Sequence, residues 1–337
     1  MPRRIDLAVA GATGLVGETV LRILRERKFP LGTLHVLASE AGERVMYDGR
    51  ALRVHALDEF DFTGVALAIF AVGQDAAAEH APRAAAAGCV VVDNSSQFRY
   101  DADVPLVVPE VNGAALAGYR QRNLVANPNC STIQLVMALK PIHDAAGIER
   151  VHVATYQSAS GGGRRLMETL AGQTAQLMNG RPLNLEPGVA QIAFNVVPHI
   201  DVFEPNGYTR EEMKIVRETR KILAEPELPV HATAVRVPVF FGHSEAVHIE
   251  TRARMEVADA RALLAKSPGL RVIDTAGSGG YPTATDAASQ DAVLVGRIRE
   301  DISHPRGLAM WIVADNVRKG AATNSVQIAE SLVKDYL

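Results

Sequence analysis

The chain has 337 residues, 47% of them hydrophobic and 22% charged, which is ordinary for a soluble globular protein and excludes a disordered one. At about 150 residues per domain, this length favours two domains. With 35 Lys and Arg against 38 Asp and Glu, the net charge of -3 shows no basic excess, so we expect no nucleic-acid partner.

The number of cysteines and the hydropathy of the chain exclude further classes of protein. The two cysteines, Cys89 and Cys130, are too few for a disulfide framework or a structural zinc site, and no cluster has the spacing of metal ligands. No uncharged apolar run approaches the ~18 residues that a membrane helix requires. We therefore expect a cytoplasmic protein that binds no metal and no membrane.

The first third of the chain alternates strand-like and helix-like segments. Runs rich in Val, Ile and Leu predict strands at residues 6–10, 33–38, 52–57, 65–72 and 89–92. An amphipathic segment at 17–28 and an Ala-rich segment at 74–87 predict helices. Nearly continuous apolar strands separated by helices indicate a parallel sheet covered on both faces. The sequence thus predicts an α/β fold with a Rossmann-type doubly wound parallel sheet.

After Pro128 the pattern changes. Helices are predicted at 131–139 and 211–223, and strands at 151–157, 231–241, 246–253 and 292–298, with a long glycine-, proline- and polar-rich stretch at 180–207. Runs of strands with fewer helices suggest a second α+β domain with a mixed sheet, which can present one face to a partner. A last helix at 324–337 is expected to pack back on the first domain. The expected domains are 1–127 completed by 317–337, and 128–316.

A glycine-rich turn follows the first strand and opens the first helix. Its sequence, Gly11-Ala12-Thr13-Gly14-Leu15-Val16-Gly17, is a G-x-x-G-x-x-G variant of the dinucleotide fingerprint. Such glycines allow a tight turn and let a pyrophosphate approach the helix N-terminus. The alternative is a strand–helix turn that needs glycine only for packing. After the second strand, Glu40 suits the ribose hydroxyls of NAD, whereas Ser39 can donate to a phosphate; Glu40 facing solvent without a role is equally consistent.

Cys130 lies in a segment whose chemistry suits a nucleophile. Asn127-Pro128-Asn129-Cys130-Ser131-Thr132 precedes an apolar helical run, so the thiol is expected in the first helical turn. There the helix dipole and free N–H groups stabilise a thiolate and can form an oxyanion hole. A thiol nucleophile needs a base, and the candidate is His243 in a glycine-containing turn. The alternatives are a small buried hydrophobe, as expected for Cys89, and a merely exposed or capping histidine.

Seven stretches carry a resemblance that covers nearly the whole chain. They are GATGLVG (11–17), NSSQFRYDADVPLVVPEVN (94–112), NPNCST (127–132), TYQSASGGG (155–163), REEMKIVRETRKI (210–222), RVPVFFGHSE (236–245) and WIVADNVRKGAATNSVQIAE (311–330). Together they resemble the aspartate-β-semialdehyde dehydrogenase family. The resemblance implies reversible, phosphate-dependent interconversion of L-aspartate-4-semialdehyde and L-4-aspartyl phosphate, running reductively on the route to lysine (via diaminopimelate), threonine and methionine.

The resemblance also implies residue roles. Cys130 would carry the acyl group as a thioester, His243 would act as general base and acid, and Gln157 would orient the substrate. Arg236 would bind the substrate carboxylate and Glu211 its ammonium, with Asn129 beside them. The family pattern assigns inorganic phosphate to Arg99 and Lys214. Cofactor contacts are expected at Gly11, Thr13, Gly14, Leu15, Val16, Gly17, Ser39, Glu40, Ser160, Gly161 and Asn316.

One departure affects the cofactor. Many NADP-using members carry an Arg-Ser pair after the second strand, whereas this chain has Ala38-Ser39-Glu40-Ala41-Gly42 and no arginine. We expect NADP on family grounds, with NAD as the close alternative. A homodimer is expected. The competing hypotheses are N-acetyl-γ-glutamyl-phosphate reductase, for which a carboxylate at Glu211 would be unexpected, and a non-catalytic paralogue, which would lose the cysteine.

Overall fold

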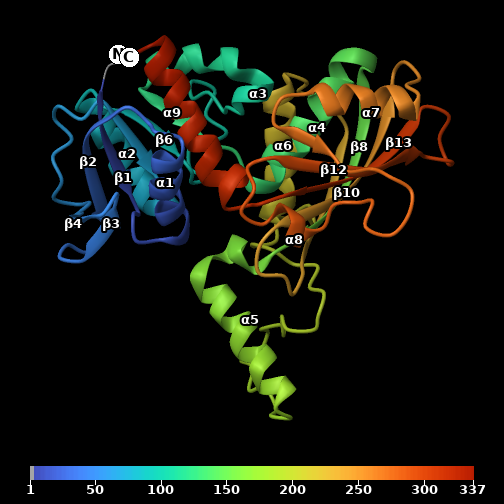
Figure 1. Cartoon of the computed structure of the whole chain (residues 1–337), viewed down its shortest axis with the longest axis horizontal. Helices are drawn as coiled ribbons and strands as arrows, with labels where there is room; N and C mark the ends of the chain where they lie inside the picture. Colours follow the sequence, from blue (N-terminus) through green and yellow to red (C-terminus); the bar gives the residue numbers. More distant parts are fainter. Residues whose placement is uncertain (1–3) are drawn as a thin grey trace. The chain divides into compact units, whose positions relative to one another are not determined.

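The computed structural model describes residues 4–337 and divides into two compact units (Figure 1). The first comprises the chain up to residue 129 together with 320–337, and the second comprises 130–319. The sequence placed these boundaries at 127/128 and 316/317. Cys130 therefore begins the second unit, at the point where the first unit ends.

The first unit contains a seven-stranded sheet. Its order is β3 (Arg44–Tyr47), β4 (Arg50–Ala56), β2 (Leu31–Ala38), β1 (Ile5–Ala10), β5 (Leu67–Phe70), β6 (Val90–Asp93) and β7 (Leu124–Ala126). All neighbours pair in parallel except β3 with β4. The chain leaves β1 on one side through β2 and returns on the other through β5. This reversal of strand order is the switch point at which doubly wound sheets bind ligands.

Helices cover this sheet. They are α1 (Leu15–Glu26), α2 (Gln74–Ala86), the short α3 (Pro109–Asn112) followed by a 3-10 segment (Gly113–Gln121), and the C-terminal α9 (Thr323–Asp335). In α1 the apolar residues Val20, Leu21 and Leu24 recur at helical spacing and are buried. They share one core with Val326 and Leu332 of α9. The C-terminal helix thus completes the first unit, packing against α1, β5 and β6.

The second unit is built on a six-stranded mixed sheet. Its order is β11 (Leu270–Val272), β12 (Val293–Glu300), β13 (Gly307–Ala314), β10 (His243–Thr251), β8 (Ile148–Gln157) and β9 (Val230–Arg236). β11 pairs with β12 and β8 with β9 in parallel, and the other pairs are antiparallel. The α/β class with one doubly wound and one mixed sheet, expected from the sequence, is confirmed.

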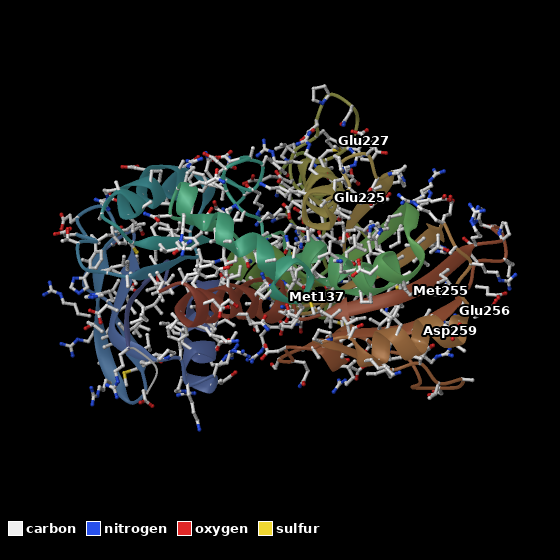
Figure 2. All side chains as sticks on the ribbon, turned by 90° about the horizontal axis from the view of Figure 1, so that it is seen from above. Met137, Glu225, Glu227, Met255, Glu256 and Asp259 are labelled. Carbon is white, nitrogen blue, oxygen red and sulfur yellow. The ribbon has the colours of Figure 1, made fainter. Side chains whose placement is uncertain are left out.

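Helices α4 (Cys130–Ala146), α6 (Arg210–Leu223) and α7 (Val257–Lys266) pack against this second sheet. Figure 2 labels Met137 on α4, and this side chain is buried. Glu256 and Asp259, labelled at the start of α7, are exposed. Short elements complete the unit: η2 (Ala159–Gly162), α8 (Ala284–Ala287) and a π-helical turn (Arg318–Ala322) through which the chain returns to the first unit.

Several local features differ from the sequence expectation. The strands β3, β7 and β11 and the helix α7 were not predicted. The strand expected at 231–241 ends at Arg236, because Pro238 cannot donate to the ladder. Helix α5 (Gly163–Met178) was not predicted, since its glycine-rich start does not look helical. The strand β13 was recognised only as part of a family stretch, because its run Gly307–Ala314, buried except for the partly exposed Trp311, lacks alternation.

Candidate active site

The glycine turn after β1 has the geometry that a dinucleotide site requires. Gly11 has φ +78°, and a Cβ there would lie 2.2 Å from the Ala71 carbonyl oxygen. A Cβ on Gly17 would lie 2.0 Å from the Gly11 carbonyl oxygen. Helix α1 begins at Leu15 after an N-cap glycine that supplies no capping side chain. The residues present therefore fit a pyrophosphate at this helix N-terminus.

Cys130 is the first residue of α4 and is partly exposed, as a nucleophile must be. The helix begins there because Pro128 two residues earlier disfavours helical backbone in its predecessor. Cys89 is the contrasting case. It is fully buried in the first unit, and burial raises the pKa of its thiol to about 12. Only Cys130 has the setting of a reactive thiol.

A chain of polar contacts lies beside Cys130 in the second unit. The amide Nε2 of Gln157, at the end of β8, donates to Ser131 Oγ at 2.6 Å and to Glu211 Oε1 at 3.0 Å. Gln157 is buried, and its Oε1 has no hydrogen-bond partner in the described chain. The side-chain amide nitrogen therefore makes two hydrogen bonds that hold Gln157 in place, and its carbonyl oxygen is available to accept one from a ligand.

The carboxylate of Glu211 is held in place by a lysine. Lys214 Nζ contacts Glu211 Oε2 at 3.1 Å and Asp201 Oδ2 at 2.8 Å. Burial opposes the charge on Lys214, but the carboxylates of Glu211 and Asp201 outweigh it and raise the pKa of the ammonium. Thr209 caps α6 through a capping box with Glu212, which fixes the first turn that carries Glu211. The site thus contains a Glu–Lys–Asp chain of ion pairs in which Glu211 is buried, Lys214 is half-buried and Asp201 is exposed.

His243 is oriented by the loop that follows β8. The backbone N–H of Ser158 donates to His243 Nδ1 at 3.1 Å, and Ser158 Oγ lies 3.0 Å from the same nitrogen. Since a backbone N–H can only donate, Nδ1 accepts, and the neutral ring carries its proton on Nε2. Burial, with Arg236 adding to it and Glu211 opposing, lowers the pKa of His243 to about 3. His243 is therefore a neutral imidazole with Nε2–H as its free donor.

Arg236 and Gly161 lie next to His243. Arg236, the last residue of β9, donates from Nη1 to the Ser158 carbonyl at 2.7 Å. Burial lowers the pKa of the guanidinium, while Glu211 and Cys130 act in the opposite direction. A Cβ on Gly161 would lie 3.0 Å from Arg236 Nη1 and 3.2 Å from His243 Nε2. Glycine at this position keeps the space between the two side chains open.

Ser158, Ser160 and Asn316 form a buried network behind the histidine. Ser158 Oγ lies 2.9 Å from Asn316 Oδ1, and Asn316 Nδ2 donates to Ser160 Oγ at 3.0 Å. The N–H of Gly242, just before His243, also donates to Asn316 Oδ1 at 3.2 Å. The side chain of Asn316, predicted to contact cofactor, is engaged in holding the loop and the histidine.

The structure brings Cys130, Gln157, Glu211, Lys214, Arg236, His243, Ser160, Gly161 and Asn316 together in the second unit. The other predicted residues belong to the first unit. Arg99 is buried there and donates from Nη2 to the Asn94 carbonyl at 2.9 Å. Asn129 is buried at the end of the unit, and Ser39 and Glu40 are exposed in the bend after β2.

Sequence reasoning missed two residues that shape the site. Ser131 receives the Gln157 amide, and its position next to the cysteine was the available signal. Asp201 pairs with Lys214 from within the long stretch 180–207, where no pattern marked it. Asp201 and Arg236 also line a cavity of ≈ 440 Å³ whose other walls come from α5 and residues 189–200. A cavity of this size suits a small amino-acid ligand.

Thiol, imidazole and a dinucleotide turn on this fold define a class: dehydrogenases that work through a cysteine. Two family models match, the "Semialdehyde dehydrogenase, NAD binding domain" over residues 6–119 and the "Semialdehyde dehydrogenase, dimerisation domain" over residues 139–319. The chain belongs to the aspartate-semialdehyde dehydrogenase family, as the resemblance in the sequence implied.

Individual relatives extend over the full length. Aspartate-semialdehyde dehydrogenase of Legionella pneumophila is 56% identical over 100% of this chain and 98% of its own. A crystal structure of aspartate semialdehyde dehydrogenase II from Vibrio cholerae complexed with ASA is 53% identical, with a TM-score of 0.96 over 99% of this chain and 100% of that one. The enzyme from Candida albicans with NADP is 25% identical, with a TM-score of 0.76 over 98% of each chain. Within residues 4–337, no helix is long and apolar enough to cross a membrane.

Proposed function

We propose that this protein is an aspartate-semialdehyde dehydrogenase that reduces L-4-aspartyl phosphate to L-aspartate-4-semialdehyde and phosphate, and runs in reverse when phosphate is supplied. The observation that carries the proposal is the combination of a partly exposed Cys130 at a helix N-terminus with the Gln157–Glu211–Lys214 chain beside it, in which Gln157 and Glu211 are buried. The full-length likeness to relatives of this name supports the choice of substrate.

The chemistry follows from the thiol. In the oxidative direction, Cys130 Sγ bonds to the aldehyde carbon, and the aldehyde hydrogen leaves with its electron pair as hydride. A phosphate oxygen then bonds to the thioester carbon while the carbon–sulfur bond breaks, which releases aspartyl phosphate and the free thiolate. The helix dipole at the start of α4 stabilises that thiolate. A bound nicotinamide supplies the acceptor, and in the other direction the source, of the hydride.

His243 stabilises the charge on the reacting oxygen. Its Nε2–H donates a hydrogen bond to that oxygen as negative charge develops there, and the proton stays on the ring when the carbonyl re-forms. The low pKa of the imidazolium keeps the ring neutral at physiological pH, so it is always ready to donate. The backbone N–H of Ser158 donates to Nδ1 and thereby keeps the proton on Nε2.

The charged groups fit a zwitterionic substrate. Arg236 binds the carboxylate as a bidentate donor, and Glu211 binds the ammonium. Charge-assisted bonds of this kind contribute about 1.5–3 kcal/mol each. Lys214 binds the phosphate. The discriminating residue is Glu211, because a substrate whose amine is acylated has no positive charge to place against a buried carboxylate.

The cofactor is a nicotinamide dinucleotide, and we assign NADP first with NAD as the alternative. The glycine turn from Gly11 to Gly17, with Thr13, Gly14, Leu15 and Val16, would hold the pyrophosphate. Ser39 would meet a 2′-phosphate, whereas Glu40 would repel it and favour a free ribose. Ser160 and Gly161 would contact the nicotinamide end. Both Ser39 and Glu40 are exposed, so a bound NADP can contact Ser39 and a bound NAD can contact Glu40.

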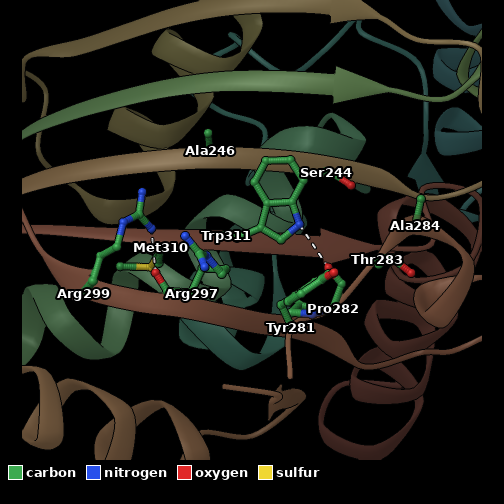
Figure 3. A pocket seen from close by; sticks show the side chains of 10 residues that line it. All are labelled: Ser244, Ala246, Tyr281, Pro282, Thr283, Ala284, Arg297, Arg299, Met310 and Trp311. Atoms are coloured by element: carbon green, nitrogen blue, oxygen red, sulfur yellow. Dashed lines mark hydrogen bonds between the residues drawn. The ribbon is translucent and has the colours of Figure 1, made fainter. Parts of the chain in front are cut away.

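We infer that the protein works as a homodimer through the face of the second sheet opposite α4 and α7. On this face the rings of Tyr156 and Trp311 lie 5.4 Å apart between centroids. Figure 3 shows the cavity of ≈ 550 Å³ around Trp311, whose Nε1 donates to the Pro282 carbonyl at 3.1 Å. Arg297 and Arg299 line its edge. The dimerisation-domain model spans this whole sheet, which supports the assignment.

The thiol also constrains the compartment. Neither Cys89 nor Cys130 is in a disulfide, and the mechanism requires Cys130 as a free thiol. We therefore place the protein in a reducing compartment such as the cytoplasm.

The test is the initial rate of cofactor reduction with L-aspartate-4-semialdehyde, with and without phosphate, for NADP and NAD in parallel. The proposal predicts a phosphate-dependent rate that Cys130→Ala abolishes and Glu211→Gln lowers. A folded, reduced protein that gives no rate with either cofactor would refute it. A rate with N-acetyl-glutamate semialdehyde instead would move the assignment to the related acyl-phosphate reductase.

A further inference from the structure

A second layer of buried polar residues lies one repeat further along the same elements that carry the catalytic residues. Gln134 is four residues after Cys130 in α4, and Glu245 is two residues after His243 in β10. Thr155 is two residues before Gln157 in β8 and pairs directly with Glu245 in the antiparallel register. Side chains at these spacings point to the same side as the catalytic ones. The proposed chemistry gives none of the three a role.

All three side chains are completely buried, and each has polar atoms without a hydrogen-bond partner in the described chain. Gln134, Thr155 and Glu245 are each 0% exposed. Both carboxyl oxygens of Glu245, both amide atoms of Gln134 and the Thr155 hydroxyl have no hydrogen-bond partner in the described chain. Burial away from water strongly disfavours an ionised carboxylate in such a place.

Within residues 4–337, the strand partners of Glu245 and the side chain that faces it include no charged group that would compensate for its burial. Its strand neighbours are Thr155 on β8 and Ile312 on β13, and Gln134 faces it from α4. On its own strand, His243 is neutral. The charged residues of α4, Lys140 and Asp144, pair with each other and are partly exposed. Burial raises the pKa of the Glu245 carboxyl well above its usual range, with Gln134 acting in the opposite direction.

A neutral acid and a primary amide are complementary. The acid O–H can donate to Gln134 Oε1 while Gln134 Nε2 donates to the acid carbonyl, which satisfies both side chains at once. An ionised Glu245 has no proton to give, so it leaves Gln134 Oε1 buried and unpaired. The alternative donor, the Thr155 hydroxyl, serves one carboxyl oxygen only.

We propose that Glu245 is a positioning residue that acts as a neutral carboxylic acid, whose pairing with Gln134 ties the His243 strand to the Cys130 helix and keeps negative charge out of the layer behind them. The positioning part rests on the proposed function; the protonation state does not. A carboxylate here would favour an imidazolium at His243 and disfavour a thiolate at Cys130. Keeping the carboxyl protonated preserves both reactive forms.

The direct test is infrared spectroscopy of the full-length protein in D2O at neutral pD. Wild type should show the carbonyl stretch of a protonated carboxylic acid, at higher frequency than the amide and carboxylate bands. Glu245→Gln should lower the intensity of this band, and the control Glu250→Gln on the same strand should leave it unchanged. A wild-type spectrum without the band, or a band that Glu245→Gln leaves unchanged, overturns the proposal whether or not the enzyme turns over aspartate semialdehyde.

Two variants test the positioning role. Glu245→Leu leaves Gln134 unpaired and should lower kcat by about 10-fold or more through displacement of the reacting groups. Glu245→Gln, which can form the same two hydrogen bonds, should restore most of that loss. At neutral pH it should also leave the alkylation rate of Cys130 unchanged. An alkylation rate that rises 10-fold in Glu245→Gln would show that the wild-type residue carries a charge, and equal kcat values in the two variants would refute the positioning role.

Discussion

Gly161→Ala tests whether Arg236 and His243 must keep their observed places. The added Cβ would lie 3.0 Å from Arg236 Nη1 and 3.2 Å from His243 Nε2 and Cε1, whereas ordinary contacts begin at 3.4 Å. One or both side chains must therefore move by about half an ångström. Since a misplacement of about 1 Å costs roughly 100-fold in rate, we expect kcat/KM to fall about 10-fold. Gly161 is exposed and its φ is not positive, so the free energy of unfolding should change little.

The matched control is Gly172→Ala in the interior of α5. A Cβ there meets nothing within 4 Å, so activity should not change, and the helix should gain about 1 kcal/mol of stability. Steady-state kinetics of both variants measures the change in kcat/KM, and urea denaturation measures the change in the free energy of unfolding. Wild-type kcat/KM in a folded Gly161→Ala protein would show that the position of these two side chains does not limit the reaction.

Three further predictions use other parts of the chain. Burial raises the folded-state pKa of Glu245, so the contribution of this residue to stability is present at low pH and is lost as the pH rises. The stability of Glu245→Gln relative to wild type should therefore increase from pH 4 to pH 8. A difference between the two melting curves that does not change with pH would contradict this. Gly17→Ala places a Cβ 2.0 Å from the Gly11 carbonyl oxygen and should weaken dinucleotide binding and destabilise the protein by about 1–3 kcal/mol, as measured by calorimetric titration and denaturation. Thiol labelling under native conditions should modify one cysteine quickly, and peptide mapping should find it at Cys130, because burial raises the pKa of Cys89 to about 12; fast labelling of Cys89 would be the contrary result.

Local patterns predicted the elements whose signal lies in adjacent residues. The apolar strand before Gly11 and the amphipathic stretch after Gly17 are sufficient to place β1, the glycine turn and α1. Pro128 and the apolar run after it likewise predict that Cys130 begins a helix. The motif stretches, not periodicity, suggested roles for Arg236 and Glu211.

Contacts between residues distant in sequence could not be predicted in the same way. The Ser158 N–H that fixes the tautomer of His243 comes from a residue 85 positions away. Asp201 meets Lys214 only because an irregular loop folds back on α6. The contact between Gln134 and Glu245 could not be predicted for a related reason. The strand pattern indicates that position 245 is buried, but it does not show which side chains would surround a carboxylate there.

The most direct test of the central claim is intact-mass analysis of the enzyme mixed with L-4-aspartyl phosphate in the absence of nicotinamide. The account predicts release of phosphate and addition of one aspartyl acyl group, which peptide mapping locates at Cys130 and which Cys130→Ala abolishes while Cys89 remains unmodified. Turnover without any acyl adduct, or an adduct on a residue other than Cys130, would contradict the assignment of Cys130 as the nucleophile.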